Sequence, residues 1–204
     1  HAGQRAVVAG LVVGRVAEQE RPRVGTFEAL GGDLVGLPAQ DGVADLGIAA
    51  TVVHDKVTEH GELIENTFDW YAQDRCGNVW YMGENTKEYE DGEVVTTAGS
   101  WEAGLDGAQP GVIMPADPQV GMTYRQEYYA GEAEDAAEVL SLDEQAQVPF
   151  GHFRDVLLTK DFTSLEPKVL EYKLYAPGIG PVLVIGVSGG SDREELLSFD
   201  LPST

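Results

Sequence analysis

Alternating apolar and polar residues run through most of the chain after residue 48 and predict β-strands. Side chains of a strand point alternately to its two faces, so this pattern indicates strands that bury one face. Short turn sequences such as Asp91-Gly92 separate the strands, which predicts an antiparallel meander. We expect strands at residues 48–58, 62–73, 79–83, 86–89, 93–97, 122–129, 132–147, 153–161, 168–175 and 181–187. The fold class is therefore mainly β, with roughly eight to ten antiparallel strands curved into a roll or barrel and few or no helices.

The most aromatic part of the chain is residues 67–84, T-F-D-W-Y-A-Q-D-R-C-G-N-V-W-Y-M-G-E, which we interpret as a β-hairpin. A loop at 74–78 with a late glycine suits a type I turn closed by a glycine in the left-handed region. Counting back from this loop places Trp70 opposite Met82. One face of the hairpin should be apolar, with Phe68, Trp70, Ala72, Trp80 and Met82, and the other mixed, with Asp69, Tyr71, Val79 and Tyr81.

The mixed face has two interpretations. A curved sheet can hold a ligand on its concave side, where tyrosines and a carboxylate would contact it. Alternatively, Tyr71 and Tyr81 pack under a loop and leave their hydroxyls in solvent.

Both ends of the chain depart from the meander pattern. The first 47 residues hold nine of the 25 glycines and a single aromatic residue, Phe27, and we expect strands near 7–16 and 23–30. The last residues have turn composition, with one short element expected at 194–199. The expected organisation is an N-terminal segment at 1–47 that adds one or two strands to the sheet, a β-roll or barrel domain at 48–187, and a C-terminal tail at 188–204.

Two internal segments are ambiguous. Residues 99–121 contain three prolines and many glycines, which is too irregular for a strand, so we expect an ordered loop that covers the sheet or forms a lid over a site. Residues 132–147 have helical propensity, yet their place between two strands favours a long strand.

The composition changes this picture mainly through charge. The formal net charge of −22 over 204 residues argues against nucleic acid and anionic membrane surfaces as partners. No apolar run reaches the roughly 18 residues of a membrane-spanning helix. Cys76, the single cysteine, lies in the hairpin loop, and we expect an exposed, non-catalytic thiol. The sequence begins at His1 without a methionine or signal peptide, so we expect a processed or truncated chain. We interpret His1 as a tag remnant, although a mature N-terminal histidine could instead ligate copper.

Several motifs form a specific set: D-W-Y-A-Q-D at 69–74, G-N-V-W-Y at 77–81, G-E at 83–84, G-S-W-E-A-G at 99–104, D-G-A-Q-P-G at 106–111, Y-R-Q-E-Y-Y at 124–129 and Y-A-P-G-I-G at 175–180. Through them, the region from 48 to 184 resembles a family of exported bacterial β-rich proteins of unassigned function. The resemblance implies export and an antiparallel sheet curved into a roll or barrel. It implies no reaction, so no catalytic residue is carried over. Cys76 stands where such proteins have Asp or Gly, and residues 1–47 lack their aromatic, strand-rich start.

Metal binding has weak support. The histidines lack zinc spacing, and no D-x-D-x-D-G loop is present. The carboxylate sets that could offer oxygen ligands are Asp69 with Glu84, and Glu132 with Glu134 and Asp135. We therefore expect no cofactor, and calcium is the metal that such oxygen ligands would suit.

The pattern favours an exported, non-catalytic binding protein that holds an apolar or amphipathic small ligand inside the curved sheet. The expected lining residues are Tyr71, Tyr81, Trp101, Arg125, Tyr128 and His152. An alternative is a carbohydrate- or ester-active enzyme, a hydrolase or lyase, that uses a carboxylate pair. Its candidate catalytic residues are Asp69, Glu84, Glu127 and His152, although Arg125 could instead be an ion-pair partner that ties strands together. A third possibility is an envelope interaction or structural protein without a pocket.

Overall fold

A computed structural model describes residues 11–16, 22–29, 46, 48, 50–59, 61–189 and 193–199. Its regular elements are strands: β1 Leu11–Val16, β2 Pro22–Ala29, β3 Thr51–Glu59, β4 Glu62–Gln73, β5 Val79–Glu90, β6 Glu93–Thr96, β7 Trp101–Glu102, β8 Gln109–Met114, β9 Thr123–Arg125, β10 Glu127–Tyr128, β11 Asp135–Val148, β12 Gly151–Thr163, β13 Leu170–Ala176, β14 Gly180–Ser188 and β15 Arg193–Phe199. The mainly β fold class is confirmed. The described residues form fifteen strands, more than the expected eight to ten, because 99–121 contributes two, 122–129 is divided into two, and the terminal segments add β1, β2 and β15. Within the described residues, no helix has the length and apolar character needed to cross a membrane.

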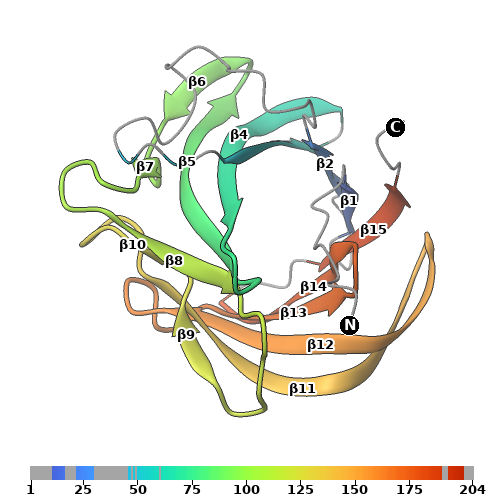
Figure 1. Cartoon of the computed structure of the whole chain (residues 1–204). Helices are drawn as coiled ribbons and strands as arrows, with labels where there is room; N and C mark the ends of the chain where they lie inside the picture. Colours follow the sequence, from blue (N-terminus) through green and yellow to red (C-terminus); the bar gives the residue numbers. More distant parts are fainter. Residues whose placement is uncertain are drawn as a thin grey trace.

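The strands form one curved antiparallel sheet. The hydrogen-bonded order is β10-β8-β5-β4-β3-β2-β1-β15-β14-β13-β12-β11-β9, and β6 and β7 each pair with β5. Figure 1 shows that this order bends round on itself, so that β4 and β5 lie opposite β12 and β13. The two end strands do not pair with each other, and the sheet is therefore a roll and not a closed barrel. Strands β1 and β2 lie in the middle of this order, where they join β3 to β15.

The chain crosses between the two ends of the sheet at a single residue, Gln126. β9 pairs with β11, and β10 pairs with β8. The predicted strand at 122–129 is therefore divided at Gln126, which is a correction to the sequence interpretation. A chain can change its strand partner at a sharp bend, and here the bend requires a glycine at position 111 because the two backbones lie close together. A Cβ on Gly111 would lie 2.2 Å from the carbonyl carbon and oxygen of Gln126.

The central hairpin forms as expected at its loop. Gly77 has a φ of 101°, and the Asp74 carboxylate accepts hydrogen bonds from the backbone N–H groups of Cys76, Gly77 and Asn78 at 2.8–3.0 Å. The same carboxylate accepts a bond from Trp80 Nε1 at 2.9 Å. These bonds hold the loop and fix the start of β5.

The register of the hairpin changes between Trp70 and Tyr71. Trp70 lies opposite Gly83 and not opposite Met82 as predicted, because β5 carries a bulge at this point. Gly83 has a φ of 138°, and a Cβ there would lie 2.3 Å from the carbonyl oxygen of Trp101. The bulge places Glu84 directly opposite Asp69, so that both carboxyls lie on one face of the hairpin.

The segment at 99–121 was expected to be too irregular for a strand, and this prediction was wrong. β7 pairs with β5 at Gly83 and Glu84, and β8 pairs with β5 at Val79 to Tyr81. The prolines do not prevent this pairing, because Pro110 lies opposite Glu127 of β10 and Pro115 and Pro118 follow the end of β8. In contrast, the strand interpretation of 132–147 is confirmed by β11.

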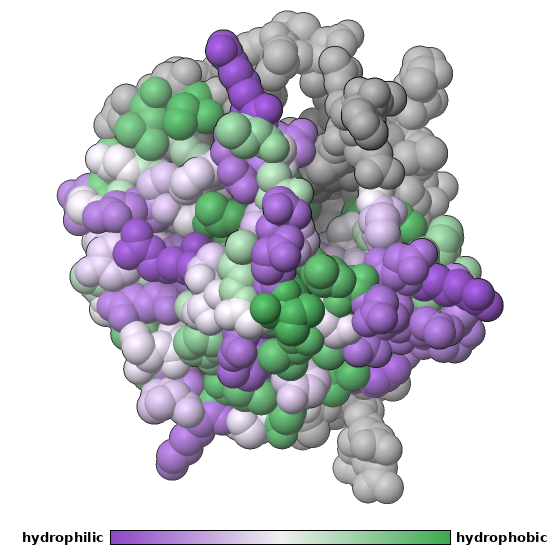
Figure 2. Space-filling view, turned by 60° about the horizontal axis from the view of Figure 1, so that its bottom comes forward, coloured by the Kyte–Doolittle hydropathy of each residue, from purple (hydrophilic) through white to green (hydrophobic). Residues whose placement is uncertain are grey.

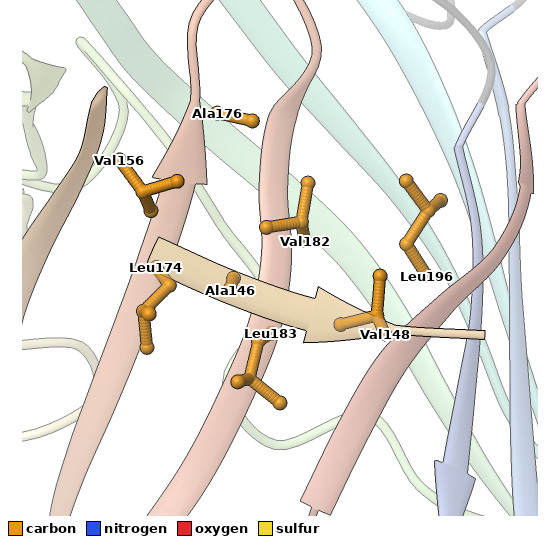
Figure 3. Close-up of a cluster of buried hydrophobic side chains, with 8 residues drawn as sticks. All are labelled: Ala146, Val148, Val156, Leu174, Ala176, Val182, Leu183 and Leu196. Atoms are coloured by element: carbon orange, nitrogen blue, oxygen red, sulfur yellow. The ribbon is translucent and has the colours of Figure 1, made fainter. Parts of the chain in front are cut away.

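Two apolar clusters hold the roll together. The first packs Trp70, Met82, Ala103 and Ala108 beside the hairpin. The second lies where the end of the β11–β12 hairpin folds over β13, β14 and β15, and Figure 3 shows Ala146 and Val148 crossing above these strands. The N–H of Phe150 donates to the carbonyl of Leu196 at 3.0 Å, which fixes the hairpin end to β15.

Candidate functional site

Three aromatic side chains lie together on the inner face of the roll, which is the face of β4 and β5 that carries Asp69 and Tyr81. The rings of Tyr71 and Tyr81 stack with centroids 5.0 Å apart, and Trp101 meets Tyr81 edge to face at 5.4 Å. The Tyr81 hydroxyl donates to Asp69 Oδ1 at 2.6 Å. The structure thus brings together three predicted lining residues and one predicted catalytic carboxylate.

Asp69 and Glu84 form a cross-strand carboxyl pair next to these three aromatic side chains. Burial raises the pKa of Asp69 from 3.8 to about 6, against the lowering effect of the hydrogen bond from Tyr81. Burial, followed by the nearby Asp69 charge, raises the pKa of Glu84 from 4.5 to about 9. At neutral pH the pair therefore holds one carboxylate and one protonated carboxyl.

Glu127 brings a third carboxyl to the cluster from β10. Its Oε2 accepts a hydrogen bond from Trp101 Nε1 at 3.1 Å. Burial and the Asp135 charge raise the pKa of Glu127 to about 7, and the bond from Trp101 acts in the opposite direction. Sequence spacing alone does not predict the contact between Glu127 and Trp101, because that contact depends on the change of strand partner at Gln126.

A second polar group on β12 and β13 was missed by the sequence analysis. Lys173 Nζ lies 3.2 Å from Asp161, whose carboxylate also accepts bonds from Gln126 Nε2 at 3.1 Å and Thr159 Oγ1 at 2.5 Å. Burial acts to lower the pKa of the Lys173 ammonium, but the Asp161 charge outweighs it and the pKa is raised. The alternation of polar residues in E-Y-K-L-Y at 171–175 was the available signal, and it resembled an ordinary solvent-facing pattern.

The carboxyl cluster and the polar group around Asp161 and Lys173 face each other across the roll. Tyr175 of β13 is close enough to Tyr71 of β4 for its charge to raise the pKa of Tyr71, after the larger effect of burial. Lys173 keeps 27% of its side chain exposed and Glu171 keeps 34%, so the inner face is not completely filled by side chains.

An open depression adjoins the carboxyl cluster. It has a volume of about 410 Å³. Among its lining residues are Trp70, Glu84, Trp101, Leu105 and Tyr129. Glu84 and Trp101 therefore belong both to the depression and to the cluster. Trp70 is only 7% exposed, and its indole N–H has no hydrogen-bond partner among the described residues.

Three predicted residues lie apart from the cluster. The Arg125 guanidinium stacks over the Tyr128 ring at 4.5 Å and donates to Gln109 Oε1 at 3.1 Å, at an exposed position. It makes no ion pair in the described part of the chain, so the strand-tying alternative is not observed. His152 is exposed at the start of β12, opposite Gln147 near the end of the β11–β12 hairpin.

Of the two carboxylate sets considered for calcium, Asp69 and Glu84 form the pair described above, whereas the set after β10 is divided between different surroundings. Glu134 accepts hydrogen bonds from the Gly131 N–H at 2.9 Å and from Ser164 Oγ at 2.5 Å, whereas Asp135 belongs to the polar group on the inner face. Among the residues that the structure describes, no group of three His, Cys, Asp or Glu side chains is placed to hold a metal ion.

Apolar residues also reach the outer surface. Figure 2 shows one gathering of them near the centre of the face drawn, bordered by hydrophilic residues. The exposed large apolar side chains include Val94, Val95, Leu142, Phe150 and Leu165. Val94 and Val95 lie on β6 and Leu142 on β11, whereas Phe150 and Leu165 lie outside the strands.

Comparison with known proteins gives little further information. No protein-family model matches the sequence, and no curated protein matches it. The crystal structure of a predicted lipoprotein from Parabacteroides distasonis is similar over 96% of each chain, at 10% sequence identity and a TM-score of 0.44. A similarity at this level supports no inference about this chain.

Proposed function

We propose that this chain is an exported, non-catalytic binding protein for a small amphipathic ligand. The observation that carries the proposal is the convergence of aromatic rings and carboxyls at an open depression, through Glu84 and Trp101. Aromatic walls contribute apolar contact area, and a few polar groups fix the orientation of a ligand. Export is supported by the resemblance carried by motifs such as Y-R-Q-E-Y-Y at 124–129, and fractionation of the source cells tests it.

Ligand-observed NMR with hexan-1-ol, hexanoate, hexylamine and p-cresol tests the binding function. At least one of these probes should bind, and Trp101→Ala should remove that binding because it deletes a wall of the depression. Trp80→Ala is the matched control, since Trp80 makes its hydrogen bond at the hairpin loop and is not part of the depression. Absence of binding by all four probes, or equal loss in both variants, would count against a site at Trp101.

A specific observation also favours a carboxylate-dependent enzyme as the second candidate. Asp69 and Glu84 face each other with pKa values raised to about 6 and about 9, which separates a base from an acid at neutral pH. Such a pair could act on a glycosidic or ester bond. Turnover of nitrophenyl glycosides or esters that disappears in Asp69→Asn, in a variant with unchanged circular dichroism, would establish this alternative over the binding function.

A further inference from the structure

The open depression beside the carboxyl cluster combines apolar and polar side chains. Its apolar surface comes from Trp70, Leu105, Ala108 and Tyr129. Its volume of about 410 Å³ lies within the range of small-molecule pockets, roughly 300–1,000 Å³. The lining residues besides these four and Trp101 are Glu84, Asn85, Thr97, Ser100, Glu102 and Asp106. The depression therefore suits a ligand that has both an apolar and a polar part.

The accessible polar groups of the depression come from three segments of the chain. Asn85 of β5 lies opposite Phe68, and Phe68 shares with Trp70 the face of β4 that points away from the carboxyl pair. Thr97 follows β6 and Asp106 follows β7. Asn85, Thr97 and Asp106 are all exposed. A ligand that contacts all three must present polar groups in several directions.

Hydrogen bonds within the chain fix the walls of the depression. The Ser100 hydroxyl accepts from the Thr86 N–H at 3.0 Å and donates to the Thr86 carbonyl at 3.2 Å. In the loop that follows, the Leu105 N–H donates to the Glu102 carbonyl at 3.1 Å, and the Ala108 N–H donates to the Leu105 carbonyl at 2.8 Å. Because these walls are already held in place, ligand binding orders little additional backbone.

The kinds of polar group at the rim favour a ligand with hydroxyls. The Asp106 carboxylate only accepts hydrogen bonds, whereas the Asn85 amide and the Thr97 hydroxyl both donate and accept. An ammonium group only donates and a carboxylate ligand only accepts, but a hydroxyl does both. The charges of Glu102 and Asp106 also repel an anion. Several hydroxyls on one compact frame would thus match the rim better than a single charged group.

We propose that the depression binds a neutral glycoside, that is, a sugar ring that carries an apolar substituent. The sugar hydroxyls donate to Asp106 and exchange hydrogen bonds with Asn85, and the apolar part packs against Leu105 and Tyr129. The proposal rests on the binding function above and names its ligand class.

Isothermal titration of the full chain with matched compounds tests this ligand class. Hexyl β-D-glucopyranoside and hexyl β-D-galactopyranoside differ from hexan-1-ol by the sugar ring, and the corresponding methyl glycosides lack most of the alkyl chain. We expect the better hexyl glycoside to bind about tenfold or more tightly than hexan-1-ol, equivalent to about 1.4 kcal/mol, and more tightly than its methyl counterpart. Hexylamine and hexanoate, the charged analogues, should bind more weakly than that glycoside.

Two turns of similar conformation provide a matched pair of variants. Asp106 has a φ of 48° before Gly107, and Asp91 has a φ of 52° before Gly92. Asparagine is tolerated at such positions, so Asp106→Asn and Asp91→Asn should both fold. Asp106→Asn should lower the preference for the hexyl glycoside over hexan-1-ol about fivefold, because a hydrogen bond to a carboxylate is stronger than one to an amide. Asp91→Asn should retain the preference, since Asp91 is not among the residues that line this depression.

The outcomes distinguish this proposal from the binding function on which it rests. Hexyl glycosides that bind no more tightly than hexan-1-ol, or more weakly than hexylamine, would overturn the ligand class and leave the binding function standing. Equal affinity for the methyl and hexyl glycosides would refute the apolar part of the ligand. Failure of all these compounds and of p-cresol to bind would overturn both proposals. A glycoside preference that is unchanged in Asp106→Asn and Asn85→Ala, or that falls equally in Asp91→Asn, would contradict this site.

Discussion

Replacing Glu84 by glutamine should stabilise the protein at neutral pH, although the substitution removes a side chain from the centre of the proposed site. In the folded chain, burial and neighbouring acids raise the pKa of Glu84 from 4.5 to about 9. The unfolded chain loses this proton near the ordinary value, so unfolding releases a proton throughout the interval between the two values. Ionisation of Glu84 therefore costs no stability below about pH 4.5, and the cost grows as the pH rises toward the folded pKa.

The magnitude follows from the size of this interval. Each pH unit above the ordinary value favours the unfolded state by about 1.4 kcal/mol, and pH 7 lies about 2.5 units above it. The upper limit of the gain in Glu84→Gln is thus about 3 kcal/mol. Glu84 is partly exposed and its neighbours titrate with it, so we expect a gain of about 1–2 kcal/mol at pH 7.

Urea denaturation followed by tryptophan fluorescence measures this effect. The free energy of unfolding of Glu84→Gln minus that of the unsubstituted chain should be larger at pH 8 than at pH 5.5. Glu90→Gln removes the same formal charge from an exposed position of β5, and its difference should stay near zero at both pH values. A Glu84→Gln variant that is less stable at pH 8, or whose gain is the same at both pH values, would refute the buried, protonated carboxyl.

Two further substitutions test the geometry that builds the cluster. Gly83→Ala should cost about 2–4 kcal/mol of unfolding free energy, because a Cβ would lie 2.3 Å from a backbone oxygen of β7. Gly92→Ala, with open space around it, should cost about 1 kcal/mol. Equal losses of the two variants in urea denaturation would argue against the close approach of β7 to Gly83. Lys173→Met should cost about 2–4 kcal/mol because it leaves Asp161, which is 5% exposed, without its cation. Lys160→Met breaks a pair whose acid is about one-third exposed and should cost about 1 kcal/mol or less, and the reverse order would contradict the buried pair.

Much of the fold can be predicted from sequence because alternation and turn residues act locally. The strands at 62–73 and near 181–187, the Asp91-Gly92 turn and the hairpin loop all follow from residues that are adjacent in the chain. Asp91 and Gly92 both have positive φ, as a two-residue hairpin turn requires.

The misjudged features depend on contacts between distant segments. The register change at Trp70 exists because β7 approaches Gly83, and the division of 122–129 exists because Gln126 crosses Gly111. A glycine in a strand signals such an approach without saying what approaches. The glycines at 83 and 111 could therefore mark irregular positions in advance, but not the partner backbone.

The candidate site was predictable only in part for the same reason. Asp69, Tyr71 and Tyr81 share a face through local alternation, and Glu84 joins them because of the bulge. Glu127 reaches Trp101 across 26 positions of the sequence, which no local pattern encodes. The polar group at Asp161 and Lys173 is located inside the roll only by the curvature of the whole sheet.

The proposed site depends most directly on the crowding of three carboxyls on the inner face. A ¹³C NMR titration of the side-chain carboxyl carbons measures the pKa of each of these groups. The resonances are assigned with the variants Asp69→Asn, Glu84→Gln and Glu127→Gln. The structure predicts midpoints of about 6 for Asp69, about 7 for Glu127 and about 9 for Glu84. Three midpoints between about 4 and 5, as for solvated carboxyls, would contradict the buried cluster and the site proposed beside it.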